Sequence, residues 1–376
     1  MEFVINNECF NKAITDVSKA ISLKTTLPIL SGIKIVANRN GVILVGSNSD
    51  IVIEKVIPLM MDDEKVLEVY ETGSVVVSAK YLSEIAKKLP NDIHLRANEK
   101  QVVTIQSDEI ITTLNGFHSE EYPRLPQFDE TACIKISSIE LIDIINQTSF
   151  AVSKSESRPV LTGVNLSFNE THLSCAATNS QRLAYREIPI ETDVKGSFIV
   201  PSSSLNELTK LLKNEVDTIH IFVTDNYIVF KSKTVSLFSR LIEGNYPNIS
   251  GLLPKETKAI IIMNTNQLLK GIDRACLFAN EWKNNNVNLE IKEGSKIRIS
   301  SNSMEIGKIE ETQTIKMIKG EADFSISLDG SFLMDALKAI RDEEIRISFC
   351  GSMRPVLIEP LDNPSQLHLI SPVRTY

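Results

Sequence analysis

Apolar positions in this chain follow a pattern that is clearest between Phe198 and Lys213. A short apolar run that begins at Phe198 is followed by hydroxyl residues and then by Leu205, Leu208 and Leu212. The first run is typical of a strand, and the leucine spacing predicts a helix with one apolar face. Between them lie Ser202 to Ser204, whose hydroxyls can accept hydrogen bonds from a first helical turn. The stretch therefore predicts a strand that is capped and continues as an amphipathic helix.

The same unit recurs along the chain, with the apolar positions in phase. Six segments carry it: VINNECFNKAI, VVSAKYLSEIAKKL, KISSIELIDII, FIVPSSSLNELTKLL, IMNTNQLLKGI and SLDGSFLMDALKAI. An alternating apolar and polar run, typical of a half-buried strand, follows three of them at Ile93 to Leu95, Ile219 to Ile221 and Ile345 to Ile347. A pattern repeated in this way predicts a repeated structural unit with six helices in all.

Shorter motifs divide these units into three tandem copies. SNSD at Ser47, TNSQ at Thr178 and SNSM at Ser301 each follow a β-rich stretch, and LPILSG resembles RPVLTG. Tyr122-Pro123 and Tyr246-Pro247 lie near the ends of the first two copies. We therefore expect domains at residues 1–128, 129–255 and 256–376. Each combines two short helices with many strands, an α+β fold in which a sheet covers the apolar face of the helices.

Charge is distributed unevenly in this scheme. The chain has 40 Lys and Arg against 48 Asp and Glu, a formal net charge of −8, so its surface as a whole should repel a polyanion. We expect bases to outnumber acids on and beside the six helices, which would form a shared basic surface; the alternative is a set of solvated helix faces. The bases in question are Lys12, Lys19, Lys24, Lys80, Lys87, Lys88, Lys210, Lys213, Lys270, Arg274, Lys338 and Arg341.

Several classes of protein are disfavoured by the sequence. It has no run of about 18 apolar residues and no basic-then-apolar leader, so we expect a cytoplasmic protein without a membrane partner. Its five cysteines form no CxxC pair, and its histidines are scattered without metal-ligand spacing. No P-loop, GxGxxG or GxSxG motif is present. We therefore expect no catalytic residue, no metal and no cofactor; a DNA-processing enzyme is the alternative that metal-dependent DNA cleavage would support.

The repeated unit and its motifs resemble a known family. LPILSG, RPVLTGV, ATNSQRLA, EGNYPNISGLLP, the MDALKAI helix and the terminal SPVRTY occur in the order found in the bacterial DNA polymerase III β subunit, the sliding clamp, in its Bacillus-like form. The resemblance implies three DNA-clamp domains per chain and a ring-shaped head-to-tail homodimer. Antiparallel sheets would lie outside, and two helices per domain would line a channel around double-stranded DNA, held without sequence preference. Such a ring is a non-catalytic factor that gives a polymerase processivity.

The resemblance also assigns residues to DNA and to the subunit contact. Lys24 and Arg158 match family positions near DNA, and Lys80 and Lys210 are further candidates for backbone contacts; each of the four could instead be merely exposed. The subunit contact would pair an edge strand around Thr112 and Leu114 with a helix around Leu277 and Phe278.

A second implied site holds partner proteins. In the family, the DNA polymerase III α subunit or PolC, the clamp loader and other proteins with a clamp-binding motif use a cleft between the second and third domains, into which polymerase and repair proteins insert an extended peptide with apolar anchors. Carried over by position, the cleft comprises Leu161, Thr178, Ser180, Gln181, Arg182, Leu183, Pro247, Leu252, Phe332, Met353, Pro355, Leu369, Ile370, Pro372, Val373 and Arg374. Burial of apolar anchors would supply most of the affinity.

The internal copies refine this assignment. Asn-Ser recurs in all three SNS or TNS segments, so we expect Asn179 and Ser180 to form a turn. Arg182-Leu183 is specific to the second copy, where it should offer a cation beside an exposed apolar residue. The family commonly has Asp and His where this chain has Asn179 and Gln181, and often a base where it has Ser202 to Ser204. These departures leave open an alternative, a divergent auxiliary clamp paralogue with altered partners.

Overall fold

The structure is a computed structural model that describes residues 1–22, 25–61, 63–130, 132–213, 217–254, 256–279, 286–292, 295–321 and 323–373. Within these ranges the chain forms antiparallel sheets and six α-helices, as the repeated pattern predicted. Each third of the sequence has the order strand, helix, several strands, helix and three strands.

The first third contains two helices and eleven strands among its described residues. They are β1 (Glu2–Ile5), α1 (Asn7–Ser18), β2 (Gly32–Asn38), β3 (Gly41–Ser47), β4 (Ile51–Pro58), β5 (Met60–Met61), β6 (Glu64–Lys65), β7 (Leu67–Glu71), β8 (Gly73–Ser78), α2 (Ala79–Ala86), β9 (Ile93–Ala97), β10 (Val102–Ser107) and β11 (Ile110–Phe117), with 3-10 turns η1 (Pro28–Ser31) and η2 (Ser119–Glu121).

The other two thirds repeat this plan. The second has β12 (Ile134–Ser137), α3 (Ser138–Asn146), η3 (Ser149–Ala151), η4 (Pro159–Thr162), β13 (Gly163–Phe168), β14 (His172–Thr178), β15 (Arg182–Pro189), β16 (Gly196–Pro201), α4 (Ser202–Leu212), β17 (Thr218–Val223), β18 (Tyr227–Lys231) and β19 (Val235–Arg240). The third has β20 (Ala259–Asn264), α5 (Thr265–Ala279), β21 (Asn286–Lys292), β22 (Lys296–Ser303), β23 (Gly307–Thr314), β24 (Met317–Gly320), β25 (Phe324–Asp329), α6 (Gly330–Ala339), β26 (Glu344–Phe349), β27 (Val356–Pro360) and β28 (Gln366–Ile370).

The strand-to-helix units form as their side chains dictate. β16 ends at Pro201 and α4 begins at Ser202, and the predicted apolar positions of α4 are buried. The Asn6 side chain accepts a hydrogen bond from the Cys9 amide at 3.1 Å, and the Asn264 side chain accepts one from the Gln267 amide at 2.9 Å. These bonds satisfy amide groups that a first helical turn leaves free, which is why a short polar residue recurs before these helices.

The sheets continue from one third of the sequence into the next. One sheet has the order β12-β17-β18-β19-β4-β3-β2-β8-β11-β10-β9-β1-β7, and another has β16-β13-β14-β15-β28-β27-β26-β20-β24. A four-stranded sheet, β23-β22-β21-β25, and the β5-β6 pair complete the described strands. Strands of the second copy therefore enter two different sheets, through the β4–β19 and β15–β28 ladders.

The chain separates into two compact units, each of which takes part of the second copy. One comprises residues 1–139 and 206–241, and the other residues 140–205 and 242–376. We call the β4–β19 ladder the first junction and the β15–β28 ladder the second junction. Each junction lies inside one unit, because a continuous antiparallel ladder joins the copies on its two sides.

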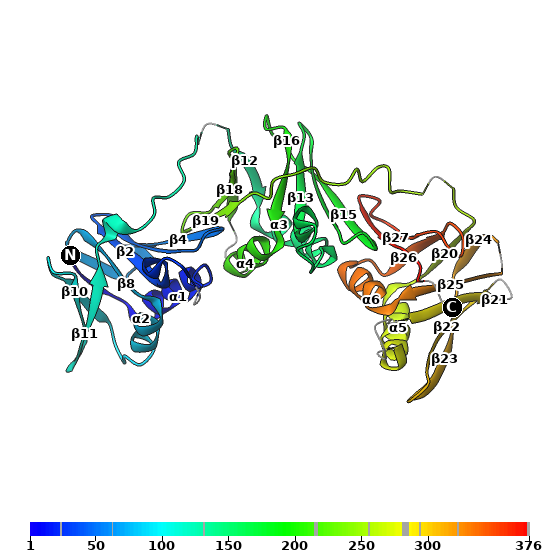
Figure 1. Ribbon diagram of the computed structural model, residues 1–376, viewed down its shortest axis with the longest axis horizontal. Helices are drawn as coiled ribbons and strands as arrows, with labels where there is room; N and C mark the ends of the chain where they lie inside the picture. Colours follow the sequence, from blue (N-terminus) through cyan, green and yellow to red (C-terminus); the bar gives the residue numbers. More distant parts are fainter. Residues whose placement is uncertain are drawn as a thin grey trace. The chain divides into compact units, whose positions relative to one another are not determined.

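Within the second unit, the core of the last third lies between helices and sheets. α5 packs beside α6 (Figure 1), and both cover a cluster of buried apolar side chains. Gly271 lets α5 approach β22 and β23: a β-carbon there would lie 2.3 Å from Gln313 Nε2 and 2.7 Å from Ile299 Cδ1. α1 packs beside α2 in the same way in the first unit. In the part of the chain that the structure describes, no helix is long and apolar enough to cross a membrane.

Candidate partner groove and nucleic-acid contacts

The Thr178–Arg182 segment is a tight turn, as the internal repeat predicted. The Asn179 carboxamide oxygen accepts hydrogen bonds from the amides of Gln181 and Arg182, both at 3.0 Å. Ser180 has a φ of +75°, the left-handed conformation that such turns require. Asn48 in the first copy makes the same two bonds, to the amides of Asp50 and Ile51. Asn179 is therefore a turn former.

The third copy departs from this turn, which corrects the expected threefold equivalence. There β22 continues to Ser303, and β23 begins four residues later at Gly307. The Ser303 hydroxyl, rather than Asn302, accepts from the amides of Glu305 and Ile306 at 3.2 and 3.0 Å. The residue that caps the turn is therefore shifted by one position, and Asn302 lies in the strand.

Arg182 is buried, which corrects the expectation of an exposed cation. Only 8% of its surface is accessible. Its Nη1 atom donates to Asp335 Oδ2 on α6 at 2.6 Å, and Nη2 donates to the Phe150 carbonyl oxygen. The guanidinium also lies 4.4 Å from the centre of the Phe332 ring, a cation–π contact. Arg182 thus joins the second copy to the third from within the second junction.

His368 lies beside this arginine and is also buried. Its pKa is lowered from 6.5 to about 3, chiefly because burial disfavours the charged imidazolium and also because Arg182 repels it. Gln366 Nε2 lies 3.1 Å from His368 Nε2, and the Phe150 ring lies 5.7 Å from the imidazole. The second junction therefore contains one buried charged side chain next to one buried neutral base.

Leu183 is likewise buried, with 2% of its surface accessible, although an exposed position was expected. It forms a cluster with Ala176, Leu367 and Leu369, and Tyr246, Ile249 and Leu253 pack against this cluster. The linker that follows Leu241 therefore covers the outer face of the second junction. A partner anchor would meet this cluster only at its rim.

The remaining predicted cleft residues differ in how exposed they are, and the exposed ones form the rim of the cluster. Leu252 and Met353 are exposed, at 43% and 58%. Ser180 and Gln181 are also exposed, whereas Leu161, Thr178, Leu369 and Ile370 are buried. Half-buried positions are Pro247, Phe332, Pro355, Pro372 and Val373; Arg374 lies outside the described residues. The structure thus supports an apolar groove with an exposed rim, which we call the second groove.

Two hollows adjoin this groove, and each contains predicted cleft residues. One, of about 440 Å³, is bordered by Tyr185, Tyr246 and Pro247 with several serine and asparagine side chains. The other, of about 1190 Å³, lies on β21, β22 and β25 and includes Met353 and Val373. Tyr185 was missed from sequence, although strand alternation after Leu183 places it on the same face.

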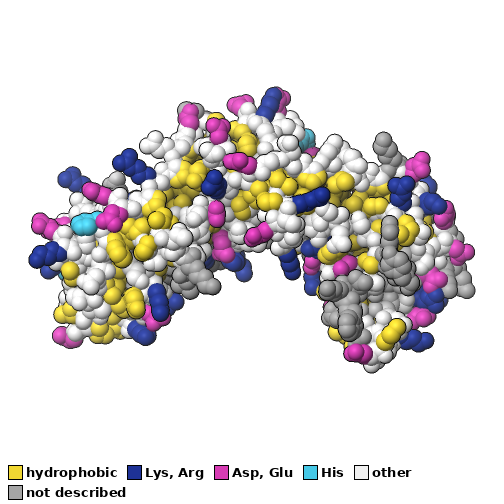
Figure 2. Space-filling model, viewed as in Figure 1, with side chains coloured by type: hydrophobic (Ala, Val, Ile, Leu, Met, Phe, Trp, Pro, Cys, Tyr) yellow, Lys and Arg dark blue, Asp and Glu magenta, His cyan; other side chains and the backbone are white. Residues whose placement is uncertain are grey.

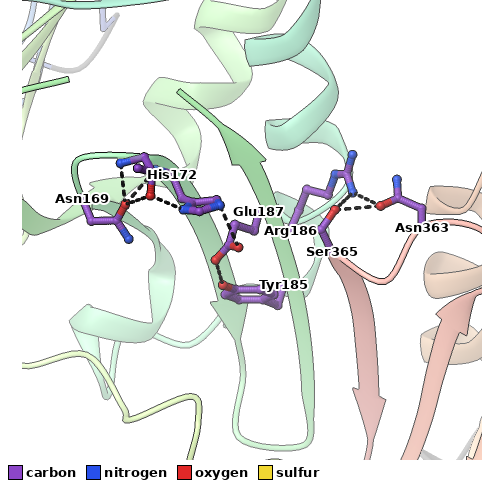
Figure 3. Close-up of polar contacts among 8 residues, drawn as sticks. Asn169, His172, Tyr185, Arg186, Glu187, Asn363 and Ser365 are labelled. Atoms are coloured by element: carbon purple, nitrogen blue, oxygen red, sulfur yellow. Dashed lines mark hydrogen bonds and ion pairs between the residues drawn. The ribbon is translucent and has the colours of Figure 1, made fainter. Parts of the chain in front are cut away.

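A polar network marks the end of the groove along β15 (Figure 3). Tyr185 Oη donates to Glu187 Oε2 at 2.7 Å, and burial together with this carboxylate raises the Tyr185 pKa to about 12. His172 Nε2 lies 3.9 Å from Glu187 Oε1. On the opposite face, Arg186 Nη1 donates to Asn363 Oδ1 and Ser365 Oγ at 2.7 and 2.6 Å. Arg186 therefore ties the strand to the loop that precedes β28.

The predicted DNA contacts are exposed where the structure describes them. Lys80 and Arg158 are exposed, at the start of α2 and immediately before η4. Lys210 is exposed too, and its Nζ atom lies 2.8 Å from Glu207 Oε1. An exposed pair of this kind is weak, so the cation remains able to meet a phosphate. Lys24 lies outside the described residues.

The expected excess of bases on the helices is wrong for the helices themselves. Within their bounds the bases are Lys12, Lys80, Lys210, Lys270, Arg274 and Lys338, against the acids Glu8, Asp16, Glu84, Glu140, Asp143, Glu207, Asp273 and Asp335. Other bases lie just beyond the helix ends: Lys19, Lys87, Lys88, Lys213 and Arg341. Cations are favoured there because helical C-termini carry partial negative charge. On the face shown in Figure 2, basic and acidic side chains are interspersed.

The predicted subunit contact residues lie at open strand edges and on a helix. β11 pairs with β8 only through Gly116 and Phe117, so the earlier part of β11 has one unpaired edge among the described strands. Thr112 and Leu114 are half-buried, but the neighbouring Ile111 is 63% exposed and was missed from sequence. In the other unit, β23 is the outermost strand of its sheet, and Leu277 on α5 is 65% exposed beside half-buried Phe278.

Comparison with known proteins follows the same division of the sequence. Models of the DNA polymerase III beta subunit match this chain with the N-terminal domain at residues 1–126, the central domain at 135–248 and the C-terminal domain at 250–374. The beta sliding clamp of Bacillus subtilis is 43% identical and that of Staphylococcus aureus (strain Mu50) is 40% identical, each over all of both chains.

Solved structures give the same result. The DNA polymerase sliding clamp of Bacillus subtilis has a TM-score of 0.96 at 43% identity, with all of both chains covered. A Pseudomonas aeruginosa sliding clamp bound to griselimycin has a TM-score of 0.91 at 25% identity, again over both whole chains. Three family models, full-length relatives and a shared fold lead to one conclusion: the chain belongs to the DNA polymerase III β subunit family, the bacterial sliding clamps.

Proposed function

We propose that two copies of this chain form a head-to-tail ring that encircles double-stranded DNA and gives the replicative polymerase its processivity. As a member of this family the chain is a non-catalytic factor rather than an enzyme. We assign three domains, residues 1–128, 129–255 and 256–376, and we place the ring in the bacterial cytoplasm, where the chromosome is replicated. The full-length match to the Bacillus subtilis clamp, with a TM-score of 0.96, carries this proposal.

Two open edges support the ring. The edge of β11 is uncharged and has exposed Ile110 and Ile111, and such an edge promotes aggregation unless another strand covers it. β23, with the exposed Leu277 of α5 nearby, offers a different surface in the other unit. A contact between unlike surfaces is head-to-tail, and it forms a closed ring when its rotation closes. The dimer would thus pair β11 with the β23 and α5 surface of its partner.

A ring need not bind DNA tightly. Contacts from Lys80, Arg158 and Lys210 to phosphates would be blind to sequence and would weaken as salt rises. Base contacts worth about 1–3 kcal/mol each would instead oppose sliding. Exposed bases at helix ends suit a clamp that is retained by topology.

Retention on circular DNA tests this proposal. The protein is loaded onto nicked circular DNA by a clamp loader, washed in high salt, and the DNA is then cut. We expect the protein to remain until the DNA is linearised and to be lost afterwards. Equal retention on linear DNA with free ends would contradict the topological account.

We propose further that the second groove holds the polymerase α subunit or PolC, the clamp loader and other proteins with a clamp-binding motif. Its exposed Leu252 and Met353, beside half-buried Pro247, suit an extended peptide with apolar anchors. Leu252→Ser should weaken binding of a polymerase-derived peptide roughly tenfold, as loss of an apolar contact of over 1 kcal/mol would. The matched control is Met317→Ser, which changes an exposed methionine on β24. Equal affinities for the two variants would remove the groove from consideration.

A divergent clamp with altered partners is the second candidate, and exposed Gln181 favours it. Asn179 occupies a turn position that its counterpart Asn48 also fills, so that departure leaves the backbone unchanged. Gln181 is free to meet a partner. If Gln181→His raises the affinity for a peptide from a Bacillus polymerase, the chain has diverged toward other partners; an unchanged affinity contradicts this candidate.

A further inference from the structure

On one face of each junction, four neighbouring strands carry a row of paired side chains, which we call its floor. The two floors correspond strand by strand. At the first junction, Val52 pairs with Phe238, Phe238 with Val229, and Val229 with Phe222. At the second junction the same row of the ladders reads Leu183, Leu369, Leu357 and Ser348. On the same face of its sheet, the first junction therefore has strands and an apolar floor that correspond to those of the second groove.

The linkers that cross these floors begin in the same way. The Thr178 amide donates to the Tyr246 hydroxyl at 3.0 Å, and the Tyr122 hydroxyl donates to the Val45 carbonyl oxygen at 3.5 Å, two residues before Ser47, the counterpart of Thr178. Burial raises the pKa of both tyrosines. Three residues further on, Leu125 packs on the first floor and Ile249 packs on the second. The two linkers are thus in register from their tyrosines onward.

Six residues after the tyrosine, the linkers diverge. Phe128 turns onto the first floor, where its ring centre lies 4.9 Å from that of Phe222 and 5.8 Å from that of Phe238. Its counterpart in the second linker is Leu252, which is 43% exposed. In the second groove Ser348 occupies the position that corresponds to Phe222. An aromatic side chain at position 252 would therefore find no aromatic partner at this position.

A charged pair also joins the first linker to the sheet beyond Phe128. Lys231 Nζ lies 2.6 Å from Glu130 Oε1 and 6.0 Å from the centre of the Phe128 ring. The ladders place Glu359 at the position of Lys231 in the second groove, and Pro254 replaces Glu130. Because an acid and a proline form no ion pair, the second linker lacks this tether.

We propose that Phe128 is a built-in occupant that closes a further partner groove at the first junction, which we call the first groove. The inference rests on the proposed partner-binding function of the second groove. Four paired differences point the same way: Phe128 against Leu252, Phe222 against Ser348, Lys231 against Glu359, and Glu130 against Pro254. A partner peptide would have to displace an aromatic stack and an ion pair to enter the first groove, so each chain presents one site to apolar peptides although its repeats build two.

Binding stoichiometry tests this inference on the full-length protein. The probe is a labelled polymerase-derived peptide with apolar anchors, titrated calorimetrically into the wild-type chain and into Phe128→Ala. We expect one peptide per wild-type chain and two per variant chain, since the alanine leaves the floor of Phe222 and Phe238 uncovered. A stoichiometry of one for a variant that melts cooperatively would overturn the inference.

The reciprocal change keeps the inference testable if Phe128→Ala does not fold. Leu252→Phe introduces the plug into the second groove and should weaken the wild-type site about tenfold or more, whereas Leu252→Met should leave it nearly unchanged. Equal affinity for the phenylalanine and methionine variants would count against the inference. If the peptide binds Phe128→Ala but not the wild type, the second groove is not the partner site, and closure of the first junction by Phe128 is supported. If the peptide binds neither protein, both hypotheses are overturned.

Discussion

The first and second junctions use the same strand ladders but differ in chemistry at two helix-facing positions. Ile51 and Leu237 occupy the helix-facing positions at the first junction, and both are buried hydrocarbon. The corresponding positions at the second junction are Arg182 and His368, also buried. On the outer face, Phe128 covers the first floor, while the rim of the second is exposed at Leu252.

The difference shows how a duplicated fold separates a structural joint from a binding site. At these two positions of the first junction the side chains are apolar and need no directional contacts, because burial alone stabilises them. The second junction must stay folded while the rim of its outer face remains open to a partner. There Arg182 holds the α6 residues Asp335 and Phe332 from the inner side through directional contacts, and on the outer face the rim at Leu252 stays exposed.

The largest expected effect comes from removing the partner of the buried arginine. Asp335→Ala leaves Arg182 buried without its carboxylate, and we expect a loss of about 3 kcal/mol, the lower end for breaking a buried pair, because Asp335 is 41% exposed. Arg182→Met should cost less, since it leaves no unpaired buried charge. Denaturant unfolding measures both. A larger loss for Arg182→Met than for Asp335→Ala would contradict the charge-based account.

His368 should make the second junction sensitive to acid. Its pKa is about 3 when folded and near 6.5 when unfolded, so the unfolded state binds more protons between these values and stability falls as the pH decreases below about 6.5. The slope for one proton reaches about 1.4 kcal/mol per pH unit. His368→Leu, which copies Leu237 of the first junction, should remove this part of the slope. Parallel stability curves for the two proteins from pH 8 to pH 5 would refute it.

A smaller effect is expected when the first linker is made like the second. Phe128→Leu keeps an apolar side chain but loses the ring contacts with Phe222 and Phe238, which we expect to cost about 1 kcal/mol because Phe128 is only half-buried. Thermal unfolding measures the change, with Leu252→Met as the control. An unchanged melting temperature for Phe128→Leu would mean that the aromatic stack contributes nothing to the junction.

The smallest effect is expected at an exposed pair of the second unit. Arg341 makes two hydrogen bonds to Asp143, at 2.8 and 2.6 Å, but its side chain is 71% exposed. Asp143→Ala should therefore cost below about 1 kcal/mol, and the loss should vanish at high salt. A loss as large as that of Asp335→Ala would show that burial does not separate the two arginine contacts.

Local pattern sufficed to predict the strands, the helices and the turn at Asn179, because each depends on side chains a few positions apart. The leucine spacing of α4 and the alternation in β9, β17 and β26 have this local origin. The exposure of Arg182 and Leu183 was predicted wrongly for the opposite reason. Asp335, which fixes Arg182, lies 153 positions further along the chain, and Leu183 is covered by a linker whose path no local pattern specifies.

By itself the sequence determined the threefold repeat, the alternation that makes the sheets and the family to which the chain belongs. Tertiary structure decided which face of each junction is closed. Phe128 and Leu252 occupy equivalent positions in two similar linkers, and both are apolar residues that the sequence alone would treat alike. The aromatic floor and the Lys231–Glu130 pair, brought together by strands more than 90 positions away, half-bury Phe128, whereas Leu252 remains exposed.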